Sequence, residues 1–261
     1  MAMDFGASST TTLTDGTSVT HSVGFKTICC WFKADTLTGV HTMISEDWVG
    51  GGGPYYCRLG VNASGQITWA IRTLSANSNW IYTTTTSIGT GEWAHACLVV
   101  GGSNDARVFL NGGGASTLPA FLPLNGSAPD ETTIGGVGST NTFDGLIGWA
   151  CTYAAKLTDT EIAILAAGAH PSMVRPSALK LFWPLGWLNG ENTNDIWSST
   201  TVTTVGTPTW SDSIPAGLIY PSQQIIGVSQ GIITPPPQHN QRQILLKNKM
   251  SIQNSRLLIG K

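Results

Sequence analysis

Two pairs of neighbouring carboxylates are the first candidates for chemistry: Glu46 with Asp47, and Asp130 with Glu131. A glycoside hydrolase needs two carboxyl groups that face one glycosidic bond, one as the acid and the other as nucleophile or base. Adjacent residues on a strand point to opposite faces, so neither pair can act in this way. We expect loop or rim charges at both pairs. We therefore predict that the protein is not an enzyme and has no catalytic residues.

His95 is the other candidate, in the middle of an apolar strand. No carboxylate or nucleophile accompanies it closely in sequence, so a packed, hydrogen-bonded core histidine is favoured over a base or a metal ligand. The sequence also has no Gly-x-Ser-x-Gly elbow, no phosphate-binding loop and no closely spaced His and Cys set suited to zinc. Binding and structural roles remain.

Aromatic and amide side chains lie in and after a glycine-rich stretch, residues 47–56. Its four glycines and a proline predict a flexible loop, because they cannot hold the pairing of a β-ladder. Exposed aromatic rings stack on sugar faces, and amides hydrogen bond to hydroxyls. The candidate carbohydrate-binding residues are Trp48, Tyr55, Tyr56, Asn77, Asn79 and Trp80. The alternative, which weighs more, is that these aromatics cover a sheet edge or fill a contact between subunits.

The clearest element that could position such a site is a hairpin over residues 91–113. Residues 93–100 are apolar on both alternating faces, which is typical of a strand covered on both sides in a layered β structure. Residues 101–105 supply turn chemistry, and Arg107–Leu110 run back as the partner strand. Asn111-Gly112 ends the hairpin, because both residues tolerate positive φ.

This hairpin resembles the central hairpin of the laminin-G-like, concanavalin A-like jelly-roll superfamily in its Trp-x-His strand, Val-Phe-Leu strand and Asn-Gly turn. A second match, Phe143–Ile147, Tyr153 and Lys156–Ile162, resembles the closing strand and short helix of that family. The resemblance covers about residues 1–215. It implies an all-β fold: a concanavalin A-like antiparallel β-sandwich, or jelly roll, with one short helix, here followed by an extended C-terminal arm.

Calcium is a common cofactor of that family, which implies several oxygen ligands at a loop rim. Asp47, Asp105 and Asp144 are conceivable contributors. They form no recognisable ligand series, and hard cations usually require more than one carboxylate. We predict no metal site and no cofactor, with calcium as the open alternative.

The remaining elements follow from alternation and turn residues. The helix is expected over Asp159–Ala167, with Thr158 as its cap, Glu161 completing a capping box and Gly168 ending it. Residues 116–130, with three prolines, are expected to be a loop. Expected strands are Gly24–Lys33, Thr42–Glu46, Tyr55–Val61, Gln66–Arg72, Trp80–Thr86, Thr132–Gly135, Leu146–Ala154 and Leu179–Leu185. Met3–Ala7 resembles the opening Phe-Gly-Ala strand of the family, which implies a further strand there.

The composition agrees with one large β domain: 31 of 261 residues are glycine and only 11% are charged. Among the five cysteines, Cys29 and Cys30 are neighbours on a strand and point to opposite faces. We find no secretion signal and no membrane-spanning stretch, and expect free, mostly buried thiols in a protein made in a reducing cytoplasm. The alternative is a secreted domain with two disulfides and one spare thiol.

Charge is unevenly distributed along the chain. All 15 acidic residues lie at or before Asp212, whereas residues 213–261 carry five basic ones. We divide the chain into a jelly-roll domain (1–215), a proline-containing linker (216–237) and a basic arm (238–261). The arm is either disordered or ordered on a partner, and its aliphatic residues favour the second. The candidate anchoring residues are Arg242, Leu245, Leu246, Lys247, Lys249, Arg256, Leu257 and Leu258.

Two functions remain. The first is a structural virion protein of a tailed bacteriophage, as capsid decoration, head fibre or tail-associated protein. It would be assembled in the host cytoplasm, anchored to other virion subunits through the arm, and homo-oligomeric. Glycan-binding adhesion at a cell surface is compatible with this role, and no membrane or direct nucleic-acid contact is expected. The alternative is a non-catalytic carbohydrate-binding module or adhesin of a bacterium.

Overall fold

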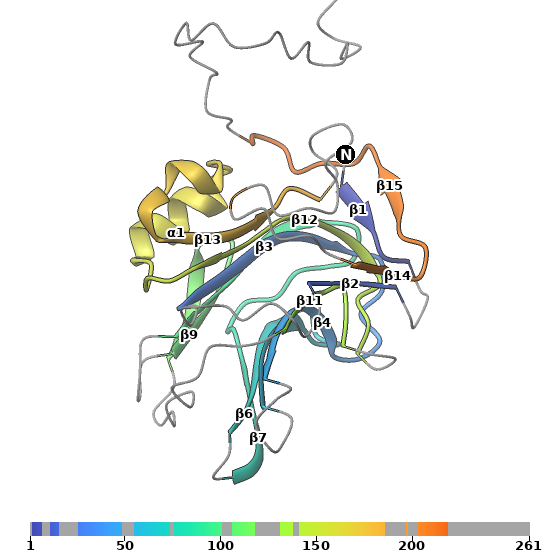
Figure 1. Ribbon diagram of the computed structural model, residues 1–261, viewed down its shortest axis with the longest axis horizontal. Coiled ribbons are helices and arrows are strands. Elements are labelled where there is room, and N and C mark those ends of the chain that lie inside the picture. The colour runs from blue at the N-terminus through green and yellow to red at the C-terminus, as the bar shows by residue number, and fades with distance from the viewer. Residues whose placement is uncertain are drawn as a thin grey trace, which may run out of the picture. The chain divides into compact units, whose positions relative to one another are not determined.

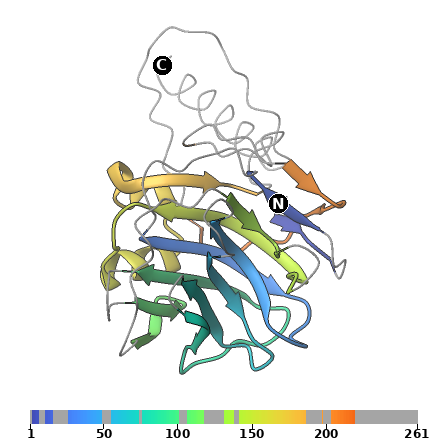
Figure 2. The same cartoon turned by 60° about the horizontal axis from the view of Figure 1, so that its bottom comes forward.

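Two antiparallel sheets face each other in the computed structural model (Figure 1, Figure 2). The structure describes residues 2–6, 11–15, 26–48, 55–73, 76–100, 106–117, 131–137, 141–185, 197 and 203–218. All of these lie in one compact unit, Met1–Pro221, while the second unit, Ser222–Lys261, is outside the described residues. The prediction of an all-β sandwich with one short helix is confirmed for the described part of the chain.

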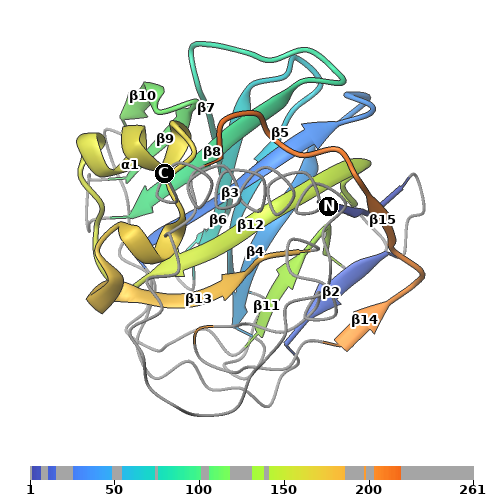
Figure 3. The same cartoon turned by 90° about the horizontal axis from the view of Figure 1, so that it is seen from above.

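The larger sheet has eight strands. Their order is β10 (Gly113–Thr117), β9 (Ala106–Leu110), β8 (Trp93–Val100), β3 (Thr27–Ala34), β12 (Gly145–Tyr153), β1 (Ala2–Asp4) and β15 (Thr209–Ser211), with β13 (Leu179–Trp183) also paired to β12. Figure 3 shows β8, β3 and β12 running side by side.

The smaller sheet has seven strands. Their order is β14 (Thr203–Val205), β2 (Thr12–Thr14), β11 (Glu131–Ile134), β4 (His41–Trp48), β5 (Tyr55–Val61), β6 (Ile67–Thr73) and β7 (Ala76–Thr83). Most strands of this sheet have one face toward the larger sheet and one face outward, which explains their alternation of apolar and polar residues.

The main hydrophobic core lies between the sheets. Its largest fully buried side chains include Trp69 on β6 and Trp183 on β13, packed with aliphatic residues from both sheets. A second core covers the opposite face of the larger sheet, where α1 (Asp159–Ala166) contributes Ile162 and Leu165. Two 3-10 helices, Pro171–Met173 and Pro176–Ala178, follow α1 (Figure 1). Because both faces are covered, all nine residues of β12 are buried.

The central hairpin is confirmed. Asn111 and Gly112 adopt φ values of 52° and 77°, and the Asn111 side chain accepts a hydrogen bond from the His95 backbone N–H at 2.9 Å. The predicted loop over residues 116–130 is wrong for its first two residues, which belong to a strand. Residues 113–117 form β10, which pairs with β9 through a register shift, and residues 118–130 lie outside the described part of the chain.

The helix begins as predicted. The Thr158 side chain accepts from the Glu161 backbone N–H, and the Glu161 carboxylate accepts in return from the Thr158 backbone N–H at 2.8 Å. Arg175 donates two hydrogen bonds of 2.8 Å to the same carboxylate. Gly168, with φ +95°, follows the last turn.

The predicted loop over residues 47–56 is shorter than expected. Asp47 pairs with Tyr56 and Trp48 with Tyr55, so these four residues extend the β4–β5 ladder, and residues 49–54 lie outside the described residues. Strand β7 starts at Ala76, before the predicted start at Trp80, because its pairing with β6 reaches Thr73. The two short strands β14 and β15 follow no alternation that the sequence makes visible.

All five cysteines are buried, as predicted, and all five are free thiols in the structure. Cys29 belongs to the core under α1, and Cys30 belongs to the core between the sheets. Within the described residues, no helix is long and apolar enough to cross a membrane.

Candidate functional site

The outer face of the smaller sheet carries the candidate site, on β4, β5 and β6. Along β5, residues Cys57, Leu59 and Val61 point into the core between the sheets. Strand geometry places the alternate residues Tyr56, Arg58 and Gly60 on the outer face. Thr68 and Ala70 of β6 pair with Gly60 and Arg58, so they share this face. The site therefore consists of alternate residues of adjacent strands, whose side chains point to the same face of the sheet.

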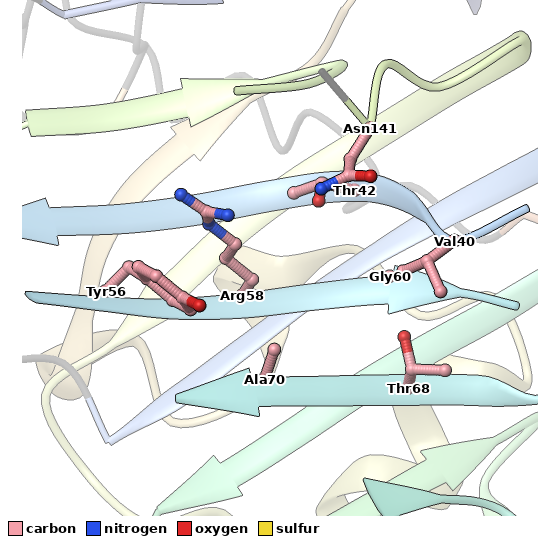
Figure 4. A pocket seen from close by; sticks show the side chains of 8 residues that line it. All are labelled: Val40, Thr42, Tyr56, Arg58, Gly60, Thr68, Ala70 and Asn141. Carbon is pink, nitrogen blue, oxygen red and sulfur yellow. The ribbon is translucent and has the colours of Figure 1, made fainter. Parts of the chain in front are cut away.

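A pocket of about 220 Å³ lies on this face (Figure 4). It is small compared with sites for drug-sized ligands, which usually exceed about 300 Å³. Gly60 and Ala70 lack long side chains and leave the space open between the neighbouring strands. The residues that line the pocket are Val40, Thr42, Tyr56, Arg58, Gly60, Thr68, Ala70 and Asn141.

Arg58 is the cation of the pocket. Its guanidinium carbon lies 3.7 Å from the centroid of the Tyr56 ring, a cation–π contact. Its Nη2 is 3.9 Å from Asp47 Oδ1, while Asp47 also accepts a 2.8 Å hydrogen bond from the Ser45 hydroxyl. The buried Nε of Arg58 makes no hydrogen bond. The tyrosine and the aspartate thus hold the guanidinium in place at the pocket.

Gly60 is required by the close approach of β4. An added Cβ at this position would lie 2.4 Å from the His41 carbonyl oxygen and 3.2 Å from the Thr68 hydroxyl oxygen. The first distance is far below van der Waals contact, and backbone cannot move aside cheaply. Glycine therefore keeps the ladder intact and the pocket open.

Comparison with known proteins places the chain in a family. A family profile described as "Concanavalin A-like lectin/glucanases superfamily" matches residues 5–163, which is more than half of the chain. The chain belongs to this superfamily. The resemblance inferred from the central hairpin and from the closing strand and helix is confirmed. No curated protein matches the sequence significantly.

Solved structures extend the comparison. A putative carbohydrate-binding protein from Bacteroides ovatus is 17% identical, over 81% of this chain and 60% of that chain, with a TM-score of 0.53. A heptameric SAP-like pentraxin from Limulus polyphemus is 18% identical, over 63% and 80%, with a TM-score of 0.49. The CBM40 of a sialidase from Ruminococcus gnavus is 15% identical, over 55% and 83%, with a TM-score of 0.44. At 17% identity, the likeness to the Bacteroides ovatus protein is one of fold.

Of the predicted carbohydrate-binding residues, Tyr56 lies in the pocket. The backbones of the other five belong to described strands, but their side chains lie outside the described residues: Trp48 and Tyr55 on β4 and β5, and Asn77, Asn79 and Trp80 on β7. Sugar binding by these residues stays a prediction. Sequence reasoning missed Arg58, although the alternation of Tyr56, Arg58 and Gly60 along a strand with an apolar opposite face could have indicated it.

The carboxylate pair on β4 is split between two faces, as predicted. Asp47 faces outward with Arg58, and Glu46 faces inward, paired with Cys57 and Thr132. The prediction that Glu46 is a loop or rim charge is wrong, because the residue lies within a strand and is only 1% exposed. Its carboxyl accepts a 3.0 Å hydrogen bond from the Thr132 hydroxyl. Burial raises its pKa well above the usual value, and the charge of Asp15 adds to this effect.

The second pair is only partly described. Glu131, on β11, accepts a 2.6 Å hydrogen bond from the Thr14 hydroxyl, and Asp130 lies outside the described residues. No two carboxylates of the described residues line the pocket.

His95 is packed in the core, as predicted. It is 2% exposed, and its ring meets the Trp31 ring edge-on with centroids 5.6 Å apart. The expected hydrogen bonding is incomplete, because the buried Nδ1 has no partner.

The carboxylates considered for calcium contact different partners and are not seen to share a site. Asp47 contacts Arg58 and Ser45, while Asp144 accepts a 2.7 Å hydrogen bond from Thr36. Asp105 lies outside the described residues. In the part of the chain that the structure describes, no group of three or more His, Cys, Asp or Glu residues is suited to a metal ion.

The candidate anchoring residues of the arm, from Arg242 to Leu258, all lie outside the described residues. Their role stays a prediction.

Proposed function

We propose that this protein binds carbohydrate without cleaving it, through the pocket on the outer face of β4, β5 and β6. The observation that carries the proposal is the lining of this pocket. Arg58 offers a guanidinium, Thr42, Thr68 and Asn141 offer hydroxyl and amide groups, and Val40, 41% exposed, offers an apolar rim. Sugars need this combination of hydrogen-bonding groups and apolar contact. Membership of a lectin and glucanase superfamily supports the class of ligand.

A larger side chain at Ala70 would fill the pocket and leave its polar residues unchanged. This gives the first prediction. Ala70→Leu extends a side chain into the space between Arg58 and Thr68 and should weaken glycan binding at least about tenfold, a loss of about 1.4 kcal/mol. Arg58→Gln should cost about as much, because a charged donor is lost. The measurement is binding of the full chain to a glycan array, followed by titration of the best ligand.

Thr160→Ala is the matched control. Thr160 is exposed on α1, which covers the other sheet, and this variant should bind like the parent protein. Undiminished binding by Ala70→Leu would place the sugar site elsewhere, with the side chains of β7 as the next candidates.

The absence of hydrolysis is part of the proposal. Glu46 is buried between the sheets and Asp47 is held beside Arg58, so they do not face a common substrate. Incubation with the glycans that bind should release no sugar. Release that disappears in Glu46→Gln or Asp47→Asn would overturn the non-catalytic assignment.

We further propose that the carbohydrate-binding domain is displayed on a virion as a structural protein. The charge separation supports this role, since every acidic residue precedes position 213 and the last 49 residues are purely basic in their formal charges. Other virion subunits are the expected partners, with a homo-oligomer as the assembled form and the host cytoplasm as the place of assembly. A bacterial carbohydrate-binding module or adhesin is the alternative, and mass spectrometry of purified virions from the source would distinguish the two.

Deleting residues 235–261 should leave a folded domain that no longer joins its assembly. The elements of both cores lie upstream of the deletion, so thermal unfolding should change little. High salt should weaken incorporation of the full chain only in part, because burial of aliphatic residues is insensitive to screening. Normal incorporation of the truncated chain, measured by sedimentation with the assembled particle, would contradict the anchoring role.

A further inference from the structure

Three thiols form a row across the larger sheet, on the face covered by α1. Cys29 on β3 stands opposite Cys97 on β8 and opposite Cys151 on β12. The three strands run side by side in Figure 3. All three side chains are buried, and the sulfur atoms of Cys29 and Cys151 are only 3.2 Å apart. We call these residues the thiol row.

The surroundings of the row make its central member different from the other two. Hydrogen bonds from Cys151 and Cys97 hold the pKa of the Cys29 thiol well below its usual range, and the neighbouring His95 adds to this effect. Burial raises the pKa values of Cys97 and Cys151, so these two keep their protons. A thiolate is the form of cysteine that reacts with oxidants. The row thus places the thiol with the lowered pKa between two thiols with raised pKa values.

The geometry points to a modification site: we propose that Cys29 and Cys151 close to a disulfide between β3 and β12 when the protein meets a peroxide. Residues directly opposite each other on antiparallel strands have Cα atoms about 4.5–5.5 Å apart, which is within the range of disulfides. Cys97 meets the same backbone condition. The sulfur contact with Cys151 selects the pair.

The reaction balances with hydrogen peroxide as the oxidant. The Cys29 sulfur attacks one peroxide oxygen, so that an S–O bond forms, the O–O bond breaks and the first water leaves with the thiol proton. The Cys151 sulfur then attacks the Cys29 sulfur. An S–S bond forms, the S–O bond breaks, and the second oxygen leaves as water with the Cys151 proton. Two thiols and one peroxide thus give one disulfide and two waters.

The cover over the row determines what can reach it. Ile162 and Leu165 of α1 belong to the apolar cluster that contains all three thiols. Hydrogen peroxide is nearly as small as water, whereas aromatic disulfide reagents need a much larger opening. We expect peroxide to react with the folded protein and a bulky disulfide reagent to react only after α1 opens.

The test is a map of thiols before and after oxidation of the full chain. The reduced protein is treated with hydrogen peroxide, denatured, alkylated and digested. Three of the five thiols should then be alkylated, and one cross-linked peptide should join Cys29 to Cys151. Dithiothreitol should restore all five thiols. Oxidation should raise the melting temperature, because the new link lowers the conformational entropy of the unfolded chain. This outcome needs no variant and so does not depend on a variant's folding.

Two variants sharpen the result. Cys57→Ala, in the other sheet, removes one thiol and should leave the cross-link unchanged. Cys151→Ala should abolish it. Five alkylated thiols after peroxide treatment, a link between Cys29 and Cys97, or a link that includes Cys30 or Cys57 would each overturn the proposal.

Discussion

Replacing Gly65 with alanine is expected to lower the free energy of unfolding by about 3–5 kcal/mol. Gly65 has φ +73°, and an added Cβ would lie 1.9 Å from the Ile88 carbonyl oxygen. The segment cannot simply move away, because the Ile88 N–H donates a 3.0 Å hydrogen bond to the Gly65 carbonyl. The variant combines an unfavourable φ with a backbone clash, and denaturation in guanidinium chloride measures the loss.

Ser64→Ala is the matched control for this prediction. Ser64 is exposed in the same turn, and its backbone N–H, which donates to Asn62 at 2.9 Å, is kept. The change should stay within about 0.5 kcal/mol. If Gly65→Ala were equally mild, the turn would have to adopt another conformation than the one described.

Glu46→Gln is expected to stabilise the protein by about 2 kcal/mol at pH 8. Burial raises the pKa of the Glu46 carboxyl well above that of an unfolded glutamate, and the charges of Asp15 and Asp47 add to the shift. The native state therefore keeps this proton to higher pH. The stability that the protonated Glu46 carboxyl contributes is fully present below about pH 4.3, and it is lost as the pH rises through the native pKa. Glutamine keeps the shape and removes the ionisation.

Urea unfolding at pH 4, 6 and 8 checks this prediction. The parent protein should lose stability with rising pH relative to Glu46→Gln, and the two should be similar at pH 4. Glu92→Gln, at an exposed position, should leave the difference unchanged. A Glu46→Gln variant that is less stable at pH 8 would mean that the native carboxyl is ionised and paired.

The parts of the fold that the sequence predicted are those decided within a few residues. The Asn111-Gly112 turn depends on two positive φ values, and the start of α1 depends on reciprocal bonds between Thr158 and Glu161. Such features carry their own signature in turn and capping residues. The family resemblance rested on the same local segments and therefore held.

The candidate site was less predictable, because it depends on register between strands. Arg58 meets Asp47 and Ala70 only through the pairing of β5 with β4 and β6. A slip of one residue would turn each of these side chains to the other face. The inward direction of Glu46 follows from the same pairing, since its partners are Cys57 and Thr132. No pattern within β4 alone fixes that direction.

The thiol row lies between these two cases. The sequence placed Cys29 and Cys30 on opposite faces, because neighbours on a strand alternate. The contact of Cys29 with Cys151 joins residues 122 positions apart and depends on β12, whose register with β3 shifts between Gly148 and Cys151. Trp149, with φ 49°, lies in that irregularity. A one-residue insertion of this kind is not visible in the pattern of apolar residues.

The complete burial of β12 also bears on how the molecule opens. Its nine residues are buried, and it is bonded to β3, β1 and β13. Amide protons of such a strand can exchange with solvent only when most of the native structure is lost, whereas those of an exposed strand such as β14 exchange through small fluctuations. Deuterium uptake at β12 should therefore report the global opening free energy of the jelly roll, residue by residue, without any denaturant.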